Sequence, residues 1–208
     1  MTENLYITAS CSIVGNVVIK DGSALFENKG AGVQPFLLSV YQHFAINYPR
    51  FYKMDSLSKL GWLAAEILLD QSFSKQDYQP EDTGLVLSNR NSSLDTDIKY
   101  YETVKTIASP ALFVYTLPNI VMGEICIRHN FKGENDFFIF DSFNAGFLQE
   151  NVSWLLETGA LKACICGWVE ILDNDYHACL YLVEKKKNNK AILFTEENIH
   201  HIYQITHG

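Results

Sequence analysis

The sequence predicts an α/β fold in which a mixed sheet of about five strands carries helices on both faces. Apolar runs of strand length alternate along the chain with segments whose apolar residues recur at helical spacing, as in layered α/β proteins. The chain then ends in two apolar runs on either side of a polar turn, which adds an antiparallel hairpin. With 208 residues, 48% of them hydrophobic, we expect residues 1–208 to form a single domain with a substantial core.

The first half of the chain contains two predicted strands and one long predicted helix. Residues 5–14 (LYITASCSIV) and 83–89 (TGLVLSN) have the composition of strands. Residues 51–71 carry leucine, isoleucine and alanine at helical spacing and predict a helix. The segment 15–50 mixes glycine, proline and aromatic residues, so we expect it to be irregular with short helices.

The second half continues the alternation of helices and strands. Residues 93–107 predict a helix that begins at Ser93 or Asp95, and Asn119 is placed to cap the helix that follows. Gly159 suits the end of a third helix, because glycine tolerates the left-handed conformation found there. The remaining predicted elements are helices over 119–130 and 145–159, strands over 136–140 and 160–171, and a hairpin over 177–195.

Charge and hydropathy argue against two classes of partner. The net charge of −8 and the isoelectric point near 5.2 disfavour nucleic-acid binding, which needs a clustered basic surface. No stretch reaches the length of a membrane span, and residues 1–10 contain no cationic segment followed by a long apolar run, so we expect a cytoplasmic protein. The basic cluster EKKKNNK, residues 184–190, lies between two apolar runs and predicts a solvated turn.

The five cysteines fit reduced thiols better than disulfides, because their number is odd and no secretion signal is evident. Cys164 and Cys166 have the spacing of a possible metal pair. They lie in the predicted strand 160–171, however, where alternate residues share one face, so we expect both to be buried in the core. The sequence therefore predicts neither a metal site nor a cofactor.

The stretch FIFDSFNAGF, residues 138–147, predicts a strand, a tight turn and the start of a helix, with Ser142 at the bend. Two interpretations stand. Ser142 is the N-cap of the helix, or it is a nucleophile placed where the free N–H groups of the helix face developing negative charge. The surrounding residues do not match the G-x-S-x-G pattern of hydrolases.

Several short motifs occur in a fixed order between residues 45 and 172. They are Ser109-Pro110, TLPN at 116–119, Gly123-Glu124, the KG pair that ends at Gly133, and G-x-x-E from Gly167 to Glu170. In this order they resemble the N-terminal half of the β-ketoacyl-acyl carrier protein synthases of the thiolase-like superfamily, and residues 50–69 resemble the early helix of that family. The resemblance implies a thiolase-like half-fold with strand 136–140 at the edge of the sheet, since synthases pair this strand across a two-fold axis.

The resemblance places the family nucleophile at position 142, where the synthases have a cysteine and this chain has Ser142. Gly133 and Gly159 match family glycines on either side. A thiol with a pKa of about 8.5 ionises with modest help, whereas the pKa of a hydroxyl, with water as a stand-in, lies roughly seven units higher. That gap is roughly 10 kcal/mol, and a helix dipole contributes only about 0.3–1 kcal/mol. Ser142 therefore needs a general base within hydrogen-bond reach.

The sequence does not supply such a base. The resemblance implies that the histidines that assist decarboxylation and condensation lie in the C-terminal half of the family, which we expect this chain to lack, and its six histidines match none of them. His129 ends a predicted helix and suits capping or surface exposure. His200 and His201 have no carboxylate partner that the sequence can place. Asp141 adjoins Ser142 on a predicted strand, where neighbours face opposite ways.

The resemblance also implies that helix 145–158 is a central helix, which in the family packs against a second half. Apolar residues occupy much of its circumference, namely Phe147, Leu148, Val152, Leu155 and Leu156. We therefore expect it to leave an apolar surface, with Leu155 as a candidate member, that a homodimer or heterodimer must cover.

Three functions remain open. The first is a non-condensing subunit, similar to the chain-length factors of type II polyketide, fatty acid or aryl-polyene systems, which pairs with a full-length ketoacyl synthase and meets an acyl carrier protein. The second is an acyltransferase that uses Ser142 with a base borrowed from another chain. The third is a module that binds acyl groups or carrier proteins without chemistry. We expect the first, and no condensation by this chain alone.

Overall fold

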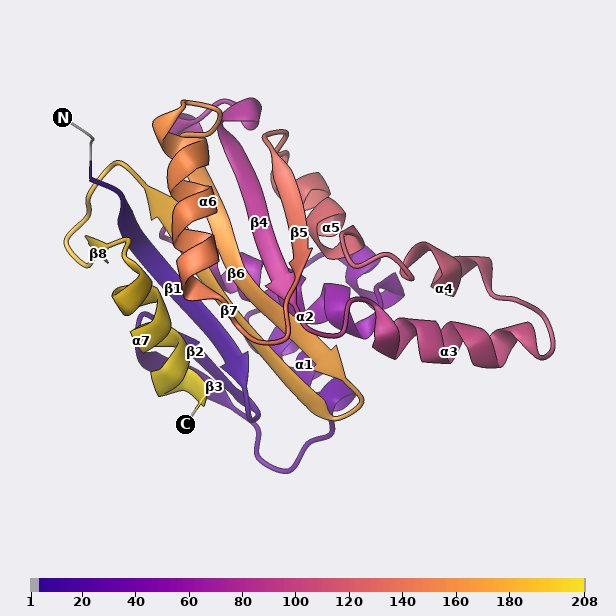
Figure 1. Ribbon diagram of the computed structural model, residues 1–208. Helices are drawn as coiled ribbons and strands as arrows, with labels where there is room; N and C mark the ends of the chain where they lie inside the picture. The colour runs from indigo at the N-terminus through magenta and orange to yellow at the C-terminus, as the bar shows by residue number, and fades with distance from the viewer. Residues whose placement is uncertain (1–3, 208) are drawn as a thin grey trace.

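A computed structural model of the chain describes residues 4–207, and the strands in this range form one mixed sheet with helices on both faces (Figure 1). The strands are β1 Tyr6–Val14, β2 Val17–Lys20, β3 Ser23–Glu27, β4 Thr83–Asn89, β5 Asn135–Ile139, β6 Ala163–Leu172, β7 Asp175–Glu184 and β8 Ile192–Leu193. The α-helices are α1 Val33–His43, α2 Ser56–Leu69, α3 Leu94–Val104, α4 Pro110–Val114, α5 Ile120–His129, α6 Ala145–Glu157 and α7 Glu196–His207.

The order of strands across the sheet is β3-β2-β1-β7-β6-β4-β5, and β8 pairs with β1 beside this path. β4 runs parallel to both β5 and β6, and the other pairs are antiparallel. The predicted mixed sheet with helices on both faces is confirmed, as is the edge position of β5. The sheet has eight strands rather than about five, because β2, β3 and β8 extend it around β1.

Residues 15–50 are more regular than the sequence analysis predicts. β1 turns into β2 at Gly15-Asn16, and β2 turns into β3 at Asp21-Gly22, with all four residues at positive φ. Two-residue turns of this conformation match the twist of a hairpin, and Asp-Gly is a strong sequence signal for them. The expectation of irregular structure with short helices is therefore wrong for the hairpin, and α1 follows it as one regular helix of 11 residues.

The predicted hairpin over 177–195 is also wrong. β7 pairs with β6 across the turn at Asp173, and with β1 on its other side. Residues 185–190 form the exposed connection that was expected, but they lead to β8, which pairs with the start of β1. The chain then forms α7, a helix that the sequence analysis missed, with the amide of Asn198 donating to Thr195 Oγ1 at 3.3 Å near its start.

The sheet separates two hydrophobic cores. α1, α2 and α5 cover one face, and α6 and α7 cover the other (Figure 1). Side chains of β7 alternate between the cores, with Leu180 in the first and Tyr181 in the second. Cys164 and Cys166 are buried together in the second core, as predicted. No helix among the described residues is long and apolar enough to cross a bilayer.

α2 is the best-covered helix of the first core. It begins at Asp55, whose carboxylate accepts a hydrogen bond from the amide of Ser58 at 2.9 Å, which satisfies one of the free N–H groups of the first turn. Twelve of its 14 residues are buried, because it packs between the sheet and both α1 and α5. This packing explains why the 51–71 segment is apolar on most of its circumference.

α6 is covered within the chain, which corrects the expectation drawn from its apolar circumference. Its apolar side packs on the sheet and against α7, and Leu155 is only 3% exposed. Phe147 lies edge-on to Phe138 and Phe140 of the β5 segment. Trp154 is its one large hydrophobic side chain with high exposure among the described residues. The apolar side of α6 is therefore not the exposed surface that the sequence predicts.

Gly167 is the tightest point of the β6–β7 pair. Its φ is +148°, and a Cβ added there would lie 2.1 Å from the carbonyl oxygen of Cys179. We expect Gly167→Ala to lower the free energy of unfolding by about 3–5 kcal/mol, through backbone strain and overpacking. Denaturation in urea measures the change. Gly123→Ala is the control, because a Cβ on that α5 residue meets open space and alanine favours helices; equal stability of the two variants would contradict this strand pairing.

Candidate functional site

Ser142 lies in the exposed connection between β5 and α6 and is not the N-cap of α6. The N-cap is Asn144, whose side chain accepts a hydrogen bond from the amide of Phe147 at 2.9 Å. Ser142 precedes it by two residues and has an exposed side chain. The strand-turn-helix elbow predicted from the sequence is present, but the N-cap interpretation of Ser142 is wrong. The helix begins two residues later than a cap at Ser142 requires, so the capping role falls to Asn144.

α7 packs directly on this elbow. Phe143 stacks on Tyr203 of α7, with ring centroids 4.0 Å apart, and lies edge-on to Trp168 of β6. Tyr203 in turn stacks on His177 at 4.7 Å, and burial, with the nearby Cys179, raises the pKa of Tyr203 to about 12. α7 is also bonded to the sheet through Tyr181 of β7, whose hydroxyl donates to the carbonyl of Ile199 at 2.9 Å. The residue after Ser142 is therefore held in one place by aromatic contacts.

A surface hollow of about 400 Å³ lies at the elbow and brings Ser142 together with two titratable residues of α7. It is lined by Phe140, Asp141, Ser142, Phe143, Asn144, Ala145, Gly146, Glu196 and His200. His200, which had no partner in the sequence analysis, thus lies in the same hollow as Glu196. Asp141 also lines the hollow, because residues 141–144 are not in a strand and the alternation expected of neighbours does not apply.

Glu196 places a carboxylate against the first turn of α6. A Cβ at Gly146 would lie 3.1 Å from Glu196 Oε1. The free N–H groups of a helix start attract negative charge, and this carboxylate already brings one negative charge to the elbow. Among the described residues, no hydrogen bond joins Ser142 Oγ to His200 or to any other group. The hollow therefore holds a serine, a histidine and a carboxylate without the contacts that activate a nucleophile.

Two carboxylates of the sequence motifs fix parts of the scaffold. Glu170 accepts hydrogen bonds from the amides of Arg90 (2.6 Å) and Asn91 (3.1 Å), which fixes the loop after β4. Glu124 is buried and accepts two hydrogen bonds from the Arg50 guanidinium at 2.7 and 3.1 Å. It also accepts one from the Tyr115 hydroxyl, and burial together with the Glu124 charge raises the pKa of Tyr115 to about 12. These carboxylates position loops and helices.

These loops carry an arm, residues 94–117, that extends from the body of the molecule (Figure 1). The arm consists of α3, the following loop and α4, joined where the amide of Ser109 donates to Thr103 Oγ1 at 3.0 Å. Its base is fixed by Ser93, which donates to the carbonyl of Thr116 at 2.9 Å, and by Asp95, which accepts from the amide of Asp173 at 3.1 Å. The arm is therefore a preformed hairpin of two helices.

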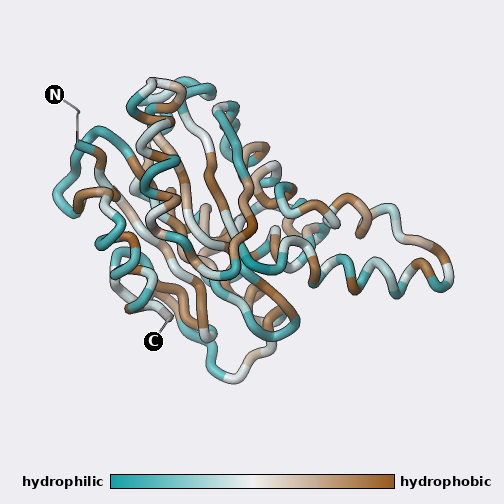
Figure 2. The backbone as a smooth tube through the Cα atoms, in the orientation of Figure 1, coloured by the Kyte–Doolittle hydropathy of each residue, from teal (hydrophilic) through white to brown (hydrophobic). Residues whose placement is uncertain are grey.

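The arm exposes a row of large hydrophobic side chains. They are Leu94, Ile98, Tyr101, Val104, Ile107, Phe113, Val114 and Leu117, and Ile107 is 86% exposed. Hydrophobic residues continue to the tip of the arm in Figure 2, and the arm extends away from the rest of the described chain. Half of the described large hydrophobic residues with high exposure lie in this one segment. Such a concentration marks an interaction surface, and the sequence analysis missed it because the helical pattern of residues 93–107 did not show which face was unpartnered.

β5 provides a second unpartnered feature, because it is the edge strand next to the arm side of the sheet (Figure 1). Among residues 4–207 it pairs only with β4, which leaves the N–H and C=O groups of its other edge without a neighbouring strand in that range. Ile139, at its end, is 49% exposed. The arm and the β5 edge together offer an apolar surface and a line of backbone hydrogen-bonding groups.

Searches by sequence found no match: neither a protein-family model nor a curated protein is similar to this chain. Solved structures of similar fold exist. The ishigamide ketosynthase/chain length factor matches with a TM-score of 0.65 at 18% identity, over 87% of this chain and 62% of that chain. A ketosynthase, ApeO, in complex with its chain length factor, ApeC, from Xenorhabdus doucetiae matches with a TM-score of 0.56 at 12% identity, over 89% and 80%.

A β-ketoacyl synthase from Burkholderia phymatum STM815 also matches, with a TM-score of 0.60 at 9% identity, over 88% of this chain and 59% of that chain. The chain thus spans less than two thirds of the length of several of these proteins. The chain has the thiolase-like fold of ketosynthases, and the resemblance found in its sequence is confirmed at the level of fold.

Proposed function

We propose that this chain, with its ketosynthase-like fold, is a non-condensing subunit that pairs with a complete ketosynthase, as chain-length factors do. The observation that carries the proposal is the arm 94–117, a preformed helical hairpin with eight large hydrophobic side chains exposed. Preorganised surfaces bind with a smaller loss of conformational entropy. Two of the similar structures contain a chain length factor, and another contains an acyl-carrier protein with its ketosynthase. The carrier protein is accordingly the second partner that we propose.

The elbow supports the absence of condensing chemistry. Ser142 stands where the resemblance places a cysteine, and its hydroxyl has no hydrogen-bonded base among the described residues. The Glu196 carboxylate lies at the start of α6, where it opposes a second negative charge. A subunit with these features contributes shape and surface to a complex and leaves bond formation to its partner.

Co-expression tests the pairing. A tagged copy of this chain is expressed with the ketosynthase whose gene lies nearest to its own, and light scattering after affinity purification gives the mass of the complex. The proposal requires a stable heterodimer. If the chain instead elutes alone as a monomer and the ketosynthase as its own dimer, the pairing is wrong, and a module that binds acyl groups or carrier proteins without chemistry takes its place.

A second candidate function, acyl transfer by Ser142, is favoured by one observation: Ser142, His200 and Glu196 line the same hollow. In this mechanism Ser142 Oγ attacks a thioester carbonyl, His200 takes the hydroxyl proton, and the thiol leaves with that proton while an ester forms on Ser142. The base then comes from the same chain. The expectation from the sequence was a base borrowed from another chain. The step needs His200 to move within hydrogen-bond reach of Ser142.

Mass spectrometry of the chain after incubation with butyryl-N-acetylcysteamine tests this candidate. Acyl transfer predicts a butyryl adduct on Ser142, lost in Ser142→Ala and formed about 100-fold more slowly in His200→Gln, since a general base contributes at least that factor. His201→Gln is the control, because His201 is the exposed neighbour that does not line the hollow. An unmodified wild-type chain, or equal rates in the two histidine variants, rules this mechanism out.

A further inference from the structure

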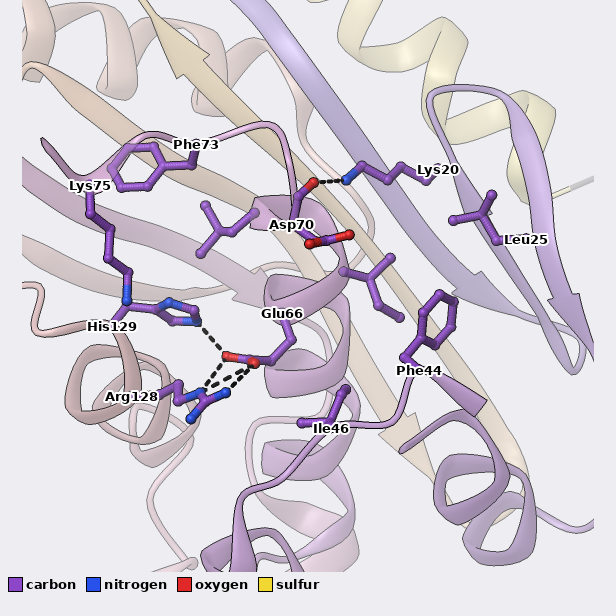
Figure 3. A pocket seen from close by; sticks show the side chains of 12 residues that line it. Lys20, Leu25, Phe44, Ile46, Glu66, Asp70, Phe73, Lys75, Arg128 and His129 are labelled. Carbon is purple, nitrogen blue, oxygen red and sulfur yellow. Dashed lines mark hydrogen bonds and ion pairs between the residues drawn. The ribbon is translucent and has the colours of Figure 1, made fainter. Parts of the chain in front are cut away.

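A second cavity lies on the face of the sheet opposite the elbow, where α1, α2 and α5 end. It has a volume of about 500 Å³, within the usual range of small-molecule sites. Its wall is formed by the β2–β3 hairpin, the residues after α1, the end of α2 and the end of α5 (Figure 3). Neither the arm nor the elbow contributes to it.

One end of the cavity contains an ion-pair cluster. The Arg128 guanidinium donates to both carboxylate oxygens of Glu66 at 3.0–3.2 Å, and His129 Nε2 lies 2.7 Å from the same carboxylate. Burial alone would raise the pKa of Glu66, but its contacts with His129 and Arg128 outweigh burial and lower that pKa. The Glu66 carboxylate is therefore ionised and already paired, so it does not attract a further cation. The expectation that His129 caps a helix or lies on the surface is wrong, because its side chain is only 8% exposed.

Lys75 lies beside this cluster and adds an unpaired positive charge (Figure 3). Its ammonium has no ion-pair partner among the described residues. Arg128 is held in place by the faces of Tyr48 and Trp62, with its guanidinium carbon 5.1 and 5.8 Å from the ring centres. The charges of Glu66 and Arg128 cancel, so the Lys75 ammonium gives this end of the cavity a net positive charge. The protein as a whole has a net charge of −8.

The other end of the cavity is mainly apolar. Leu25 and Phe44 lie at this end, whereas Phe73 lies beside Lys75 (Figure 3). Lys20 and Asp70 border this end, and the Lys20 ammonium donates to the backbone carbonyl of Asp70 (Figure 3). The Asp70 carboxylate disfavours an anion here, so a negative head group belongs at the Lys75 end and an apolar chain along the wall.

From this arrangement we propose that the cavity binds a small amphipathic anion: a carboxylate or phosphate head group at Lys75 and Arg128, followed by a short hydrocarbon chain against Leu25, Phe44 and Ile46. A carboxylate or phosphate oxygen accepts charge-assisted hydrogen bonds from both cations. The apolar chain gains the free energy of leaving water along the wall. This site is independent of the proposed pairing with a ketosynthase, and its failure would leave that proposal untouched.

Calorimetric titration with sodium octanoate, at concentrations below its micelle threshold, tests the site. Octyl phosphate distinguishes a phosphate head group from a carboxylate, acetate has the head group without the chain, and octylammonium has the chain with the opposite charge. Octanoate or octyl phosphate is expected to bind at least about tenfold more tightly than octylammonium and acetate, because each of these lacks one of the two interactions. Equal binding of octylammonium, or no binding of either anion, overturns the proposal.

Two exposed residues allow the site to be altered without disturbing the core. Lys75→Ala removes the unpaired charge, and Leu25→Asp places a carboxylate on the apolar wall, where Leu25 is 42% exposed. Each is expected to weaken octanoate binding about five- to tenfold, a modest factor because both positions face solvent. Lys105→Ala, on the arm, removes the same charge elsewhere and should bind as the wild type does. If Lys75→Ala and Lys105→Ala bind octanoate equally and melt at the same temperature, the anion does not use this cavity.

Discussion

Replacing Ile107 by lysine is expected to abolish pairing with a ketosynthase at micromolar concentration while leaving the fold intact. Ile107 is 86% exposed at the tip of the arm, so the free chain loses almost no packing when it is changed. In a complex that covers the arm, the variant loses the burial of an isoleucine side chain, about 1.5–3 kcal/mol, and must desolvate an ammonium. We expect an increase in Kd of about 30- to 1,000-fold, which corresponds to about 2–4 kcal/mol.

A matched control separates this effect from general changes in surface charge. Ile205→Lys makes the same substitution on α7, where Ile205 is 58% exposed and lies away from the arm. It should pair with the ketosynthase as the wild type does. Phe113→Lys, at a position 59% exposed on α4, should behave like Ile107→Lys. Sedimentation of each variant with the ketosynthase measures the Kd, and thermal melting of each free chain measures its stability.

The arm hypothesis fails if Ile107→Lys and Phe113→Lys pair as tightly as Ile205→Lys. Pairing would then depend on the β5 edge, the other unpartnered feature of this side of the molecule. Ile139→Pro removes a backbone N–H at that edge and would then weaken pairing more than either arm variant. This comparison assigns the interface to one of the two features.

The second prediction with a large effect is that this chain catalyses no condensation, even when a thiol is introduced at position 142. The purified chain is expected to form no ketoacyl product from malonyl-carrier protein, and Ser142→Cys is expected to form none either. A cysteine removes the gap of roughly 10 kcal/mol between hydroxyl and thiol ionisation, but the Glu196 carboxylate at the start of α6 still opposes a thiolate. His200 is the one histidine among the described residues that line the hollow, whereas the resemblance assigns histidines to decarboxylation as well as to condensation.

Mass spectrometry of the carrier protein detects the ketoacyl product, and a complete ketosynthase serves as the positive control. A double variant, Ser142→Cys with Glu196→Gln, separates the two causes. If the opposing charge matters, this variant should react faster with iodoacetamide than Ser142→Cys alone, because a lower thiol pKa gives more thiolate. It should still form no ketoacyl product. Product from the chain in the absence of a partner would end the proposal of a non-condensing subunit.

The fold class was available from the sequence because it depends on local patterns. Continuous apolar strands such as 83–89, helical spacing in residues 51–71 and the ordered motifs from Ser109 to Glu170 each require only neighbouring residues to interpret. The serine at position 142, where the resemblance places a cysteine, is likewise a property of the sequence alone. The Asp21-Gly22 turn was equally local, and its hairpin could have been predicted.

Tertiary structure decided which surfaces stay exposed and which side chains meet. An amphipathic pattern shows that a face is buried, but the covering element is chosen by long-range packing. α7 covers α6 and brings Glu196 and His200 to Ser142 across more than 50 positions of sequence. The sequence therefore showed neither that α6 is covered within the chain nor that these two side chains lie at the elbow. For the same reason the helix predicted over 93–107 did not show whether its apolar residues would be covered. Only the folded chain showed that Ile107 is 86% exposed in the described part of the molecule.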